Sequence, residues 1–220
     1  MYNSLRVGKI NSRDQMNKTA AHNFRLHSQP NIDATQTPNN RVLLNTLQMD
    51  LTNRQGFAKA FLGHYESNGV KEKKGNVLAL EMVVSASPEM FEGKTQEQIG
   101  LWAQEQVDFA QEKFGENCRL AVLHLDEKTP HIHFLISTEQ KTVKRYRNQK
   151  GEFFKETVSL NAKRWNPAFL TKLHDDHGRL NEKWGLKRGE KGSKRAHKTL
   201  KEYYGELNAL ESELKNGLSQ

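Results

Sequence analysis

The stretch CRLAVLHLDEKTPHIHFLIS, residues 118–137, decides the architecture of this chain. Residues 118–124 and 131–137 are apolar runs rich in Val, Leu and Ile, and the polar segment LDEKTP at 125–130 lies between them. Two such runs around a polar, proline-containing turn predict two strands joined as an antiparallel hairpin. The connection of six residues is slightly longer than those that hairpins use most often.

Three histidines fall at strand-compatible spacing in this stretch. Residues i and i+2 of a strand point to the same face, so His131 and His133 project together while Ile132 points to the opposite, buried face. In an antiparallel pair His124 lies opposite His131, with Cβ atoms about 5 Å apart. Neutral imidazole is a common ligand of Zn, Mn, Fe and Ni, and three protein ligands leave coordination positions open for catalysis. We therefore predict a divalent metal site formed by His124, His131 and His133. Ordinary strand histidines are the alternative, which is disfavoured because three of the nine histidines fall within ten residues.

Two carboxylates, Asp126 and Glu127, occupy the turn beside these histidines. Either could be a fourth metal ligand, a partner that orients an imidazole, or a general base. Turn carboxylates more often stay in solvent or cap the turn, and this reading is stronger for Asp126. We therefore take Glu127 as the catalytic candidate.

A second motif, AHNFRLH, spans residues 21–27. His22 and Arg25 are three residues apart, which predicts that they share a face if this stretch is helical. Such a pair can serve phosphate chemistry, because the imidazole can attack or carry a proton while the guanidinium binds oxygens. A surface His–Arg pair without a function is the alternative.

The remaining patterns predict an α+β fold. Strands and helices intermix without a regular β-α-β alternation, which favours a largely antiparallel sheet. Residues 12–29 are helix or loop, and Thr95 and Gly115 are suited to cap the helix between them. The other predicted elements are strands at 5–11, 41–45 and 76–87, helices at 53–68, 95–115 and 159–184, and a basic hairpin at 142–158. We expect a catalytic domain over 1–184, then a basic linker and a C-terminal helix over 185–220, the helix at about 195–214.

Positive charge is concentrated in one block of the 220-residue chain, whose formal net charge is +8. Residues 1–140 carry 15 Lys and Arg against 16 Asp and Glu, whereas residues 141–201 carry 18 against 6. A near-neutral body with a basic block indicates a polyanionic partner, most often nucleic acid. The candidate DNA-binding residues of the block are Lys144, Arg145, Arg147, Lys150, Lys163, Arg164, Lys187, Arg188, Lys194 and Arg195. Tyr146, Phe153, Phe154 and Trp165 could stack on bases, although core packing is more natural for Trp165.

Other features exclude whole classes of protein. No window approaches 18 uncharged apolar residues, so we expect no transmembrane helix. The N-terminal residues MYNSLRVGKINSRD lack the apolar core of a signal peptide. The lone cysteine, Cys118, excludes an internal disulfide framework and fits a reducing cytosol, so we expect a cytoplasmic protein.

HNFR followed by HLDEKTPHIH resembles the Mob/Pre (MobV) family of plasmid mobilisation relaxases, within the His-hydrophobe-His (HUH) superfamily of single-strand nucleases. The resemblance runs from the first strand to KRAHKTLKEYY, nearly the whole chain. It implies a five-stranded antiparallel sheet flanked by helices and a Mn²⁺ or Mg²⁺ ion. It also implies site-specific nicking and rejoining of one strand at an origin of transfer, with covalent attachment to the 5′-phosphate. The implied partner is DNA, both a hairpin and the adjoining single strand.

The resemblance also implies residue roles. His22 matches the nucleophile, Arg25 matches a contact to the DNA backbone, and Asn45 matches a strand motif, which makes it a DNA-binding candidate. The histidine nucleophile is not universal among relatives, so tyrosines stay as alternatives: Tyr2, Tyr65, Tyr146, Tyr203 and Tyr204. Family members usually continue into a long coiled coil, so a homo-oligomer through such a region stays open.

Three other functions compete with a relaxase. A non-catalytic DNA-binding mobilisation accessory protein would use the basic block and carry structural histidines. A replication initiator or transposase would use the same metal cluster on other DNA. A metal hydrolase of a small substrate would not need the basic block, which argues against it.

Overall fold

The computed structural model describes residues 1–149 and 151–189. The predicted helix at 195–214 and the candidates Lys150, Lys194, Arg195, Tyr203 and Tyr204 lie outside the described residues. No helix within these ranges is both long and apolar enough to cross a membrane. The elements are β1 (Asn3–Ile10), α1 (Arg13–Asn23), β2 (Arg41–Asn45), α2 (Gly56–Ser67), β3 (Ala79–Ala86), α3 (Gln96–Phe114), β4 (Cys118–His124), β5 (His131–Ser137), β6 (Glu139–Asn148), β7 (Gly151–Leu160) and α4 (Pro167–Asn181).

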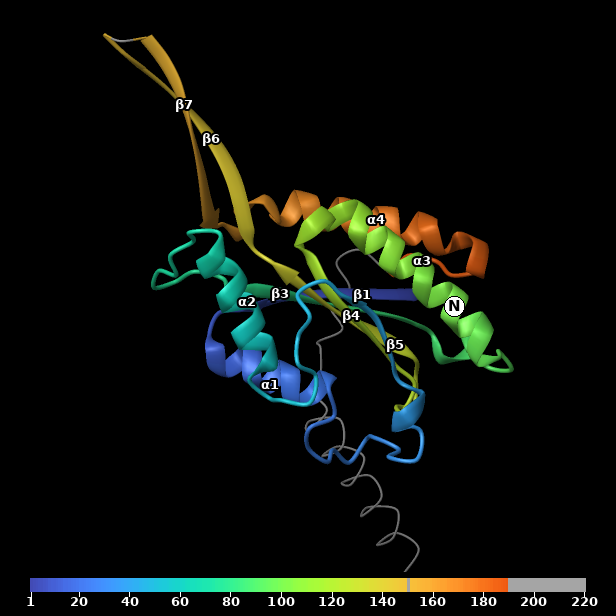
Figure 1. Cartoon of the computed structure of the whole chain (residues 1–220). Helices are drawn as coiled ribbons and strands as arrows, with labels where there is room; N and C mark the ends of the chain where they lie inside the picture. The colour runs from blue at the N-terminus through green and yellow to red at the C-terminus, as the bar shows by residue number, and fades with distance from the viewer. Residues whose placement is uncertain (150, 190–220) are drawn as a thin grey trace, which may run out of the picture. The chain divides into compact units, whose positions relative to one another are not determined.

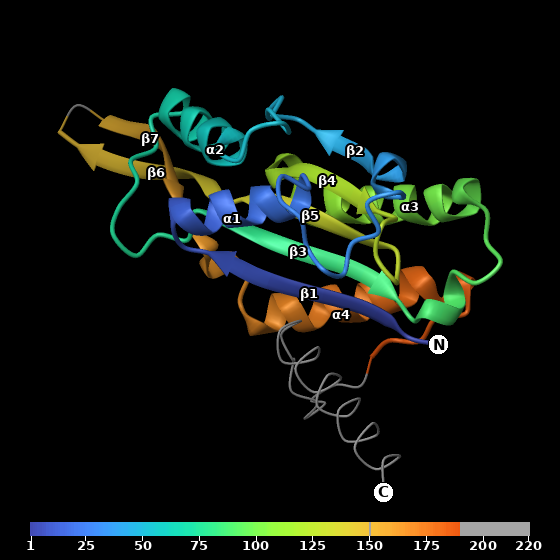
Figure 2. The same cartoon turned by 90° about the horizontal axis from the view of Figure 1, so that it is seen from below.

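Five strands form one sheet in the order β1-β3-β5-β4-β2 (Figures 1 and 2). Every neighbouring pair is antiparallel, so the predicted five-stranded antiparallel sheet and α+β class are confirmed. The predicted hairpin at 118–137 forms its centre, because β5 pairs with both β4 and β3.

Strand alternation gives the sheet two covered faces, each with its own core (Figure 1). On one face α3 and α4 pack against side chains such as Met82, Phe134 and Ile136. On the other face α1 and α2 pack against Leu135 and Val122. The histidines of β4 and β5 belong to this second face, because they alternate with the residues that point to α3 and α4.

Helix α3 shows why these residues form a helix in this place. The Thr95 hydroxyl accepts from the Gln98 backbone N–H at 3.2 Å, and the Gln98 side chain accepts from the Thr95 N–H at 3.0 Å. This capping box satisfies two N–H groups that have no partner inside the helix. Gly115 ends the helix with a φ of 58°, and Trp102 is fully buried at its centre. The predicted helix at 95–115 is confirmed.

Strands β6 and β7 form a separate two-stranded ribbon that projects beyond the main sheet (Figure 1). Their register runs from Glu139 opposite Leu160 to Asn148 opposite Gly151, so the predicted basic hairpin is confirmed and is longer than expected. Most of its side chains are exposed.

The predicted helix at 159–184 is wrong in its first third. Strand pairing continues to Leu160, a short 3-10 turn follows, and α4 begins only at Pro167. The Asn166 side chain accepts from the Phe169 N–H at 3.0 Å and caps the helix, and Pro167 suits its first turn because it needs no N–H partner there. Ladder hydrogen bonds and this cap outweighed the helical spacing of the apolar residues.

The first residues of the predicted basic linker, 185–189, pack against the body. Leu186 is 1% exposed in the α3/α4 core. The Asn3 N–H donates to the Lys187 carbonyl at 2.9 Å, and the Lys187 N–H donates to the Met1 carbonyl at 3.0 Å. The compact unit therefore runs to Gly189.

Candidate active site on the histidine face of the sheet

The strand register brings the three predicted histidines together. His124 pairs with His131, and Ile132 is completely buried on the opposite face, as expected. The ring centroids of His124, His131 and His133 are 4.9–5.0 Å from one another. His124 and His133 are buried, and His131 is half-buried. The predicted convergence of the three rings is therefore confirmed, while their role as metal ligands stays a prediction.

Each ring uses one nitrogen to hold an oxygen outside the cluster. His124 Nε2 donates to the Asn23 carbonyl at 2.9 Å. His131 Nδ1 donates to the Thr129 carbonyl at 2.9 Å. His133 Nδ1 donates to the Glu81 carboxylate at 2.8 Å. Because these oxygens only accept, the opposite nitrogen of each ring carries a lone pair.

The inner nitrogens fit a cation. His124 Nδ1 and His131 Nε2 are 3.2 Å apart, and two lone pairs cannot satisfy each other. His133 Nε2 is buried without a hydrogen-bond partner among the described residues. Two imidazole nitrogens bound to one ion at about 2.1 Å, at roughly tetrahedral angles, are separated by about 3.4 Å. This donor set therefore suits a divalent metal that accepts imidazole.

Burial keeps His124 and His133 in the neutral form that binds metals. It lowers the pKa of His124 and of His133, and repulsion between the neighbouring rings adds to the effect in both. Burial also raises the pKa of the Glu81 carboxyl. In many metalloproteins a carbonyl or carboxylate that accepts from the outer ring nitrogen orients the metal-bound histidine. The Asn23 carbonyl and the Glu81 carboxylate occupy such positions here. Sequence reasoning missed both, because neither belongs to the His124–His133 motif.

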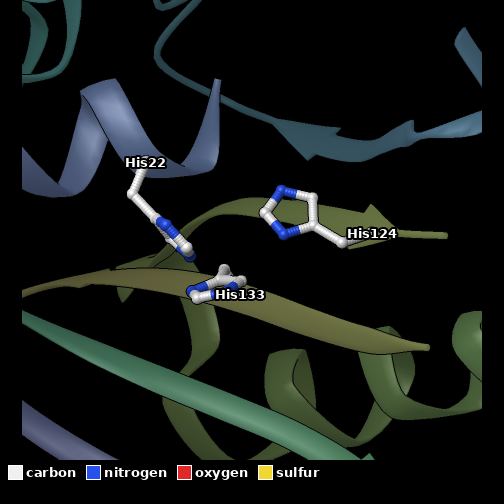
Figure 3. A group of neighbouring side chains, drawn as sticks. All are labelled: His22, His124 and His133. Carbon is white, nitrogen blue, oxygen red and sulfur yellow. The ribbon is translucent and has the colours of Figure 1, made fainter. Parts of the chain in front are cut away.

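Among the described residues two donor sets have ligand atoms close enough to share an ion, and each contains two of the three predicted histidines. Ligand atoms of His22, His124 and His133 lie within 4.8 Å of one another, as do those of His124, Glu127 and His131. Figure 3 shows His22 reaching from α1 toward the rings of His124 and His133. The site is therefore a cluster of four imidazoles with one carboxylate at its edge.

His22 stands in the last turn of α1, beside the cluster. Its ring centroid is 5.2 Å from that of His133 and 6.0 Å from that of His124. Its Nδ1 donates to Gln29 Oε1 at 2.7 Å, so its Nε2 carries the lone pair. Burial lowers the pKa of His22, and the hydrogen bond to Gln29 opposes this shift. No sequence motif marked Gln29.

The prediction that His22 and Arg25 share a helical face is wrong, because α1 ends at Asn23. The Arg25 N–H donates to the His22 carbonyl at 3.2 Å and the Leu26 N–H donates to the Ala21 carbonyl at 3.0 Å, which together form a Schellman motif. Arg25 takes its left-handed position with a φ of 56°, where glycine is usual. An arginine at such a position indicates that its side chain has a specific task.

That side chain binds the two carboxylates of the turn at 125–130. Arg25 Nη2 lies 2.7 Å from Asp126 Oδ1 and 2.8 Å from Glu127 Oε1, and the side chain is 7% exposed. Asp126 also accepts from the side chains of Thr37 and Asn40. Burial alone would raise the pKa of Asp126, but these hydrogen bonds lower it to about 2. Asp126 is therefore a buried structural centre, whereas the sequence favoured a solvated or capping role.

Glu127 lies between Arg25 and the cluster. Its Oε1 accepts from Arg25 and is 3.6 Å from His131 Nε2. Its Oε2 accepts from the Asn31 amide at 2.7 Å. Because His131 Nε2 carries a lone pair, it does not donate to Glu127, and the ring is oriented by Thr129 instead. Glu127 therefore stands beside the histidines as a candidate metal ligand, one of the three roles left open by the sequence.

The described DNA-binding candidates lie on separate parts of the fold. Lys144, Arg145 and Arg147 lie on the β6–β7 ribbon, where Arg145 pairs with Glu152. Lys163 and Arg164 lie in the turn before α4, and Arg164 stacks on Trp165 with its guanidinium carbon 5.5 Å from the ring centroid. Lys187 and Arg188 lie at the β1 edge, where Arg188 pairs with Asp175 at 2.6 Å. Asn45 closes a turn through two hydrogen bonds to the Met49 backbone, at 2.9 and 3.1 Å.

The aromatic side chains predicted to stack on bases are exposed on the ribbon, except for one that is buried in the core. Tyr146 and Phe153 stack on the ribbon with ring centroids 5.5 Å apart, and both are exposed. Phe154 is 65% exposed, whereas Trp165 is buried in the α3/α4 core, as predicted. The ribbon therefore carries the exposed aromatics.

The three described tyrosines differ in their surroundings. Tyr65 is buried and its hydroxyl donates to the Leu78 carbonyl at 2.6 Å, while burial raises the pKa of that hydroxyl. Tyr146 stacks in the ribbon, and Tyr2 is exposed at the β1 edge beside Lys187.

Comparison with known proteins supplies the family. The family model Mob_Pre, described as plasmid recombination enzyme, matches residues 1–205. A 65 kDa protein of Zymomonas mobilis is 30% identical over 173 residues, which are 76% of this chain and 27% of that protein. A plasmid recombination enzyme of a Bacillus species is 28% identical over 200 residues, which are 87% of this chain and 44% of that enzyme. The chain thus spans less than half the length of both relatives.

Solved structures share the fold. The MobM relaxase domain (MOBV; Mob_Pre), in a Mn-bound crystal structure with 22-nucleotide pMV158 oriT DNA, superposes with a TM-score of 0.71 at 22% identity. The match covers 93% of this chain and 98% of that one. A complex of the same domain with 22-nucleotide DNA and a 3′-thiophosphate gives a TM-score of 0.71 at 24% identity. Because the family model matches nearly the whole sequence, the chain belongs to the Mob_Pre family of plasmid recombination enzymes.

Proposed function

We propose that this chain is a relaxase domain that nicks one DNA strand at a plasmid origin of transfer and later rejoins it, with a divalent metal as cofactor. The observation that carries the proposal is the set of inward lone pairs on His124, His131 and His133, with His22 beside them. The fold shared with MobM relaxase domains, whose structures hold Mn and oriT DNA, supports it.

The metal would be held by His124 Nδ1, His131 Nε2 and His133 Nε2, and Mn²⁺ or Mg²⁺ is the candidate ion. When bound, it would polarise the scissile phosphate and neutralise developing charge. The Mn in the MobM crystals supports Mn²⁺. Imidazole nitrogen binds first-row transition metals, whereas Mg²⁺ prefers oxygen ligands. Of the two candidate ions, a set of three imidazoles therefore favours Mn²⁺.

His22 would be the nucleophile. Its Nε2 lone pair attacks phosphorus, a P–N bond forms, and the bond between phosphorus and the 3′-oxygen breaks. The 3′-oxygen leaves with the bonding pair and takes a proton from solvent, and the 5′-phosphate stays on His22. The Gln29 carbonyl oxygen holds the Nδ1 proton throughout, which keeps Nε2 free for attack. The reverse step, attack by a 3′-hydroxyl, rejoins the strand.

Arg25 and Glu127 would act as positioning residues. Arg25 binds Asp126 and Glu127, and both carboxylates belong to the turn that joins His124 to His131. Its guanidinium is therefore committed within the protein and is 7% exposed. We propose this role for Arg25 in place of a contact with the DNA backbone. Glu127 would hold Arg25 and Asn31 at the edge of the cluster, with its Oε1 3.6 Å from His131 Nε2.

DNA would bind through the β6–β7 ribbon. Its Lys144 and Lys155 are cross-strand partners, as are Tyr146 and Phe153, so one side of the ribbon carries charge beside stacked rings. Lysines neutralise phosphates and exposed rings stack on bases.

A nicking assay on supercoiled oriT plasmid tests the proposal. We expect relaxation with Mn²⁺ and none with EDTA, and a His131→Ala variant should lose nicking while keeping much of its DNA binding. His174→Ala is the matched control, because His174 lies in α4 on the opposite side of the sheet. Metal-independent binding without any nicking would instead support the accessory protein. Nicking without preference for an origin of transfer would support an initiator or transposase.

Mass spectrometry of the protein–DNA adduct identifies the nucleophile. A phosphoramidate on His22 is acid-labile, so mild acid should release the DNA, and His22→Ala should form no adduct. An acid-stable adduct on a tyrosine would refute the assignment of His22 while leaving the nuclease activity in place.

A further inference from the structure

A cavity of about 460 Å³ opens beside His22 and is not used by the chemistry described above. Its lining residues are Lys18, Ala21, His22, Leu26, His27 and Arg54. This volume falls in the range of small-ligand sites. Three of these residues carry or can carry positive charge in addition to His22, and no carboxylate lines the cavity in the part of the chain that the structure describes.

The cavity is assembled from three separate segments. Lys18, Ala21 and His22 share one side of α1, since they are three and four residues apart. The Schellman motif at the end of α1 then turns the chain back, which brings Leu26 and His27 beside the same helical turn. Arg54 comes from the loop before α2. The basic character of the cavity is therefore a product of the fold, in a half of the sequence that is near neutral.

The charged side chains of the cavity are available to a ligand. His27 and Arg54 make no hydrogen bond or ion pair with any other described residue. Lys18 pairs with Asp14 at 2.7 Å, but both side chains are more than 60% exposed, and such surface pairs are weak. The floor contributed by Ala21 and Leu26 is apolar. This combination suits an anion attached to an apolar body, as in a nucleotide.

His22 connects the cavity to the proposed reaction. Its ring lines the cavity and also lies 5.2 Å, between centroids, from His133. In an in-line displacement the leaving 3′-oxygen lies opposite the attacking nitrogen, so the departing strand points away from His22. The nucleotide that keeps its 5′-phosphate stays beside the imidazole, where the cavity opens.

We propose that this cavity binds the first nucleotide of the strand that remains attached to the protein, with the phosphate on its 3′ side bound by Lys18 and Arg54. The inference rests on the proposed function, because it presupposes that His22 receives the 5′-phosphate. A group that holds the retained end would keep it positioned for rejoining.

Thymidine 3′,5′-bisphosphate tests the proposal, since it is one nucleotide with a phosphate on each side. Its affinity for the whole chain is measured by isothermal titration calorimetry in EDTA, so that no reaction takes place. A Lys18→Gln/Arg54→Gln variant should bind it at least about tenfold more weakly, because two charge-assisted contacts are lost. Lys71→Gln/Lys74→Gln is the matched control, which removes the same charge from two exposed lysines outside the cavity and should leave the affinity unchanged.

Equal weakening in both double variants would show only a general effect of charge and would overturn the proposal, as would unchanged affinity in Lys18→Gln/Arg54→Gln. Inorganic phosphate that binds as tightly as the bisphosphate would overturn the nucleotide site in favour of a plain anion site. Circular dichroism and thermal unfolding check that both variants fold. If the wild-type chain binds as expected but forms no DNA adduct, the proposed function fails while the nucleotide site stands.

Discussion

His177 in α4 should make the protein sensitive to mild acid. It is 1% exposed, its Nδ1 accepts from the Asn3 amide at 2.7 Å, and its Nε2 donates to Gln106 Oε1 at 2.9 Å. These bonds join α4 to β1 and α3. The bond from Asn3 requires the neutral ring, because a protonated Nδ1 cannot accept, whereas Nε2 donates to Gln106 in either form. Burial lowers the pKa of His177 from 6.5 to about 3, and repulsion from His174 adds to the shift.

The magnitude follows from proton linkage. Between pH 6.5 and 3 the unfolded chain binds a proton at His177 that the folded chain does not, so the free energy of unfolding decreases as the pH falls. A pH of 5 lies about 1.5 units below the pKa of His177 in the unfolded chain. The free energy of unfolding is therefore about 2 kcal/mol lower at pH 5 than above pH 6.5. The full stability is present above pH 6.5.

Urea unfolding of the wild type and of His177→Gln at pH 7 and pH 5 measures this contribution. The glutamine does not titrate. Between pH 7 and pH 5 the free energy of unfolding of the wild type should therefore fall by about 2 kcal/mol more than that of the variant. Other buried histidines contribute equally to both proteins and cancel. An equal loss in both proteins would refute the reasoning. NMR titration of the wild type gives a second check, because the His177 ring should not titrate above pH 4.

Three further predictions concern packing, the turn and the metal. Gly56→Ala should destabilise the protein by more than about 2 kcal/mol, because its Cβ would lie 2.0 Å from the Asp50 carbonyl oxygen; Gly63→Ala in the same helix meets open space and should be neutral or stabilising in the same urea experiment. Arg25→Lys should keep Mn²⁺ binding in calorimetry but slow adduct formation about tenfold or more, since an ammonium cannot replace the planar fork that bridges two carboxylates; an unchanged rate would show that the fork is dispensable. Mn²⁺ at 100 times the dissociation constant of the wild type should raise the free energy of unfolding of the wild type by about 2.7 kcal/mol. An equal gain in His133→Ala at the same Mn²⁺ concentration would place the ion elsewhere.

Local patterns in the sequence were sufficient for most of the secondary structure. The hairpin at 118–137, the capped helix at 95–115 and the basic ribbon were predicted because each depends on neighbouring residues: strand alternation, an N-cap residue with a terminal glycine, and a short turn. The helix predicted at 159–184 failed where strand pairing with β6 competed with helical spacing. That competitor is remote in sequence, so a local pattern could not reveal it.

For the candidate site, the sequence by itself was enough to predict that His124 pairs with His131 and that His133 shares their face, because an antiparallel hairpin around the turn at 125–130 and strand alternation place them so. The tertiary structure alone decided the rest. It brought the ring centroids of His22 and His133 to 5.2 Å from each other, turned Arg25 toward Asp126, and formed the cavity at Arg54. Each of these contacts joins segments that are distant in the chain, and their proximity depends on how α1 and the loops pack on the sheet. Side-chain packing between remote elements has no period or motif in the sequence, so only the folded chain reveals it.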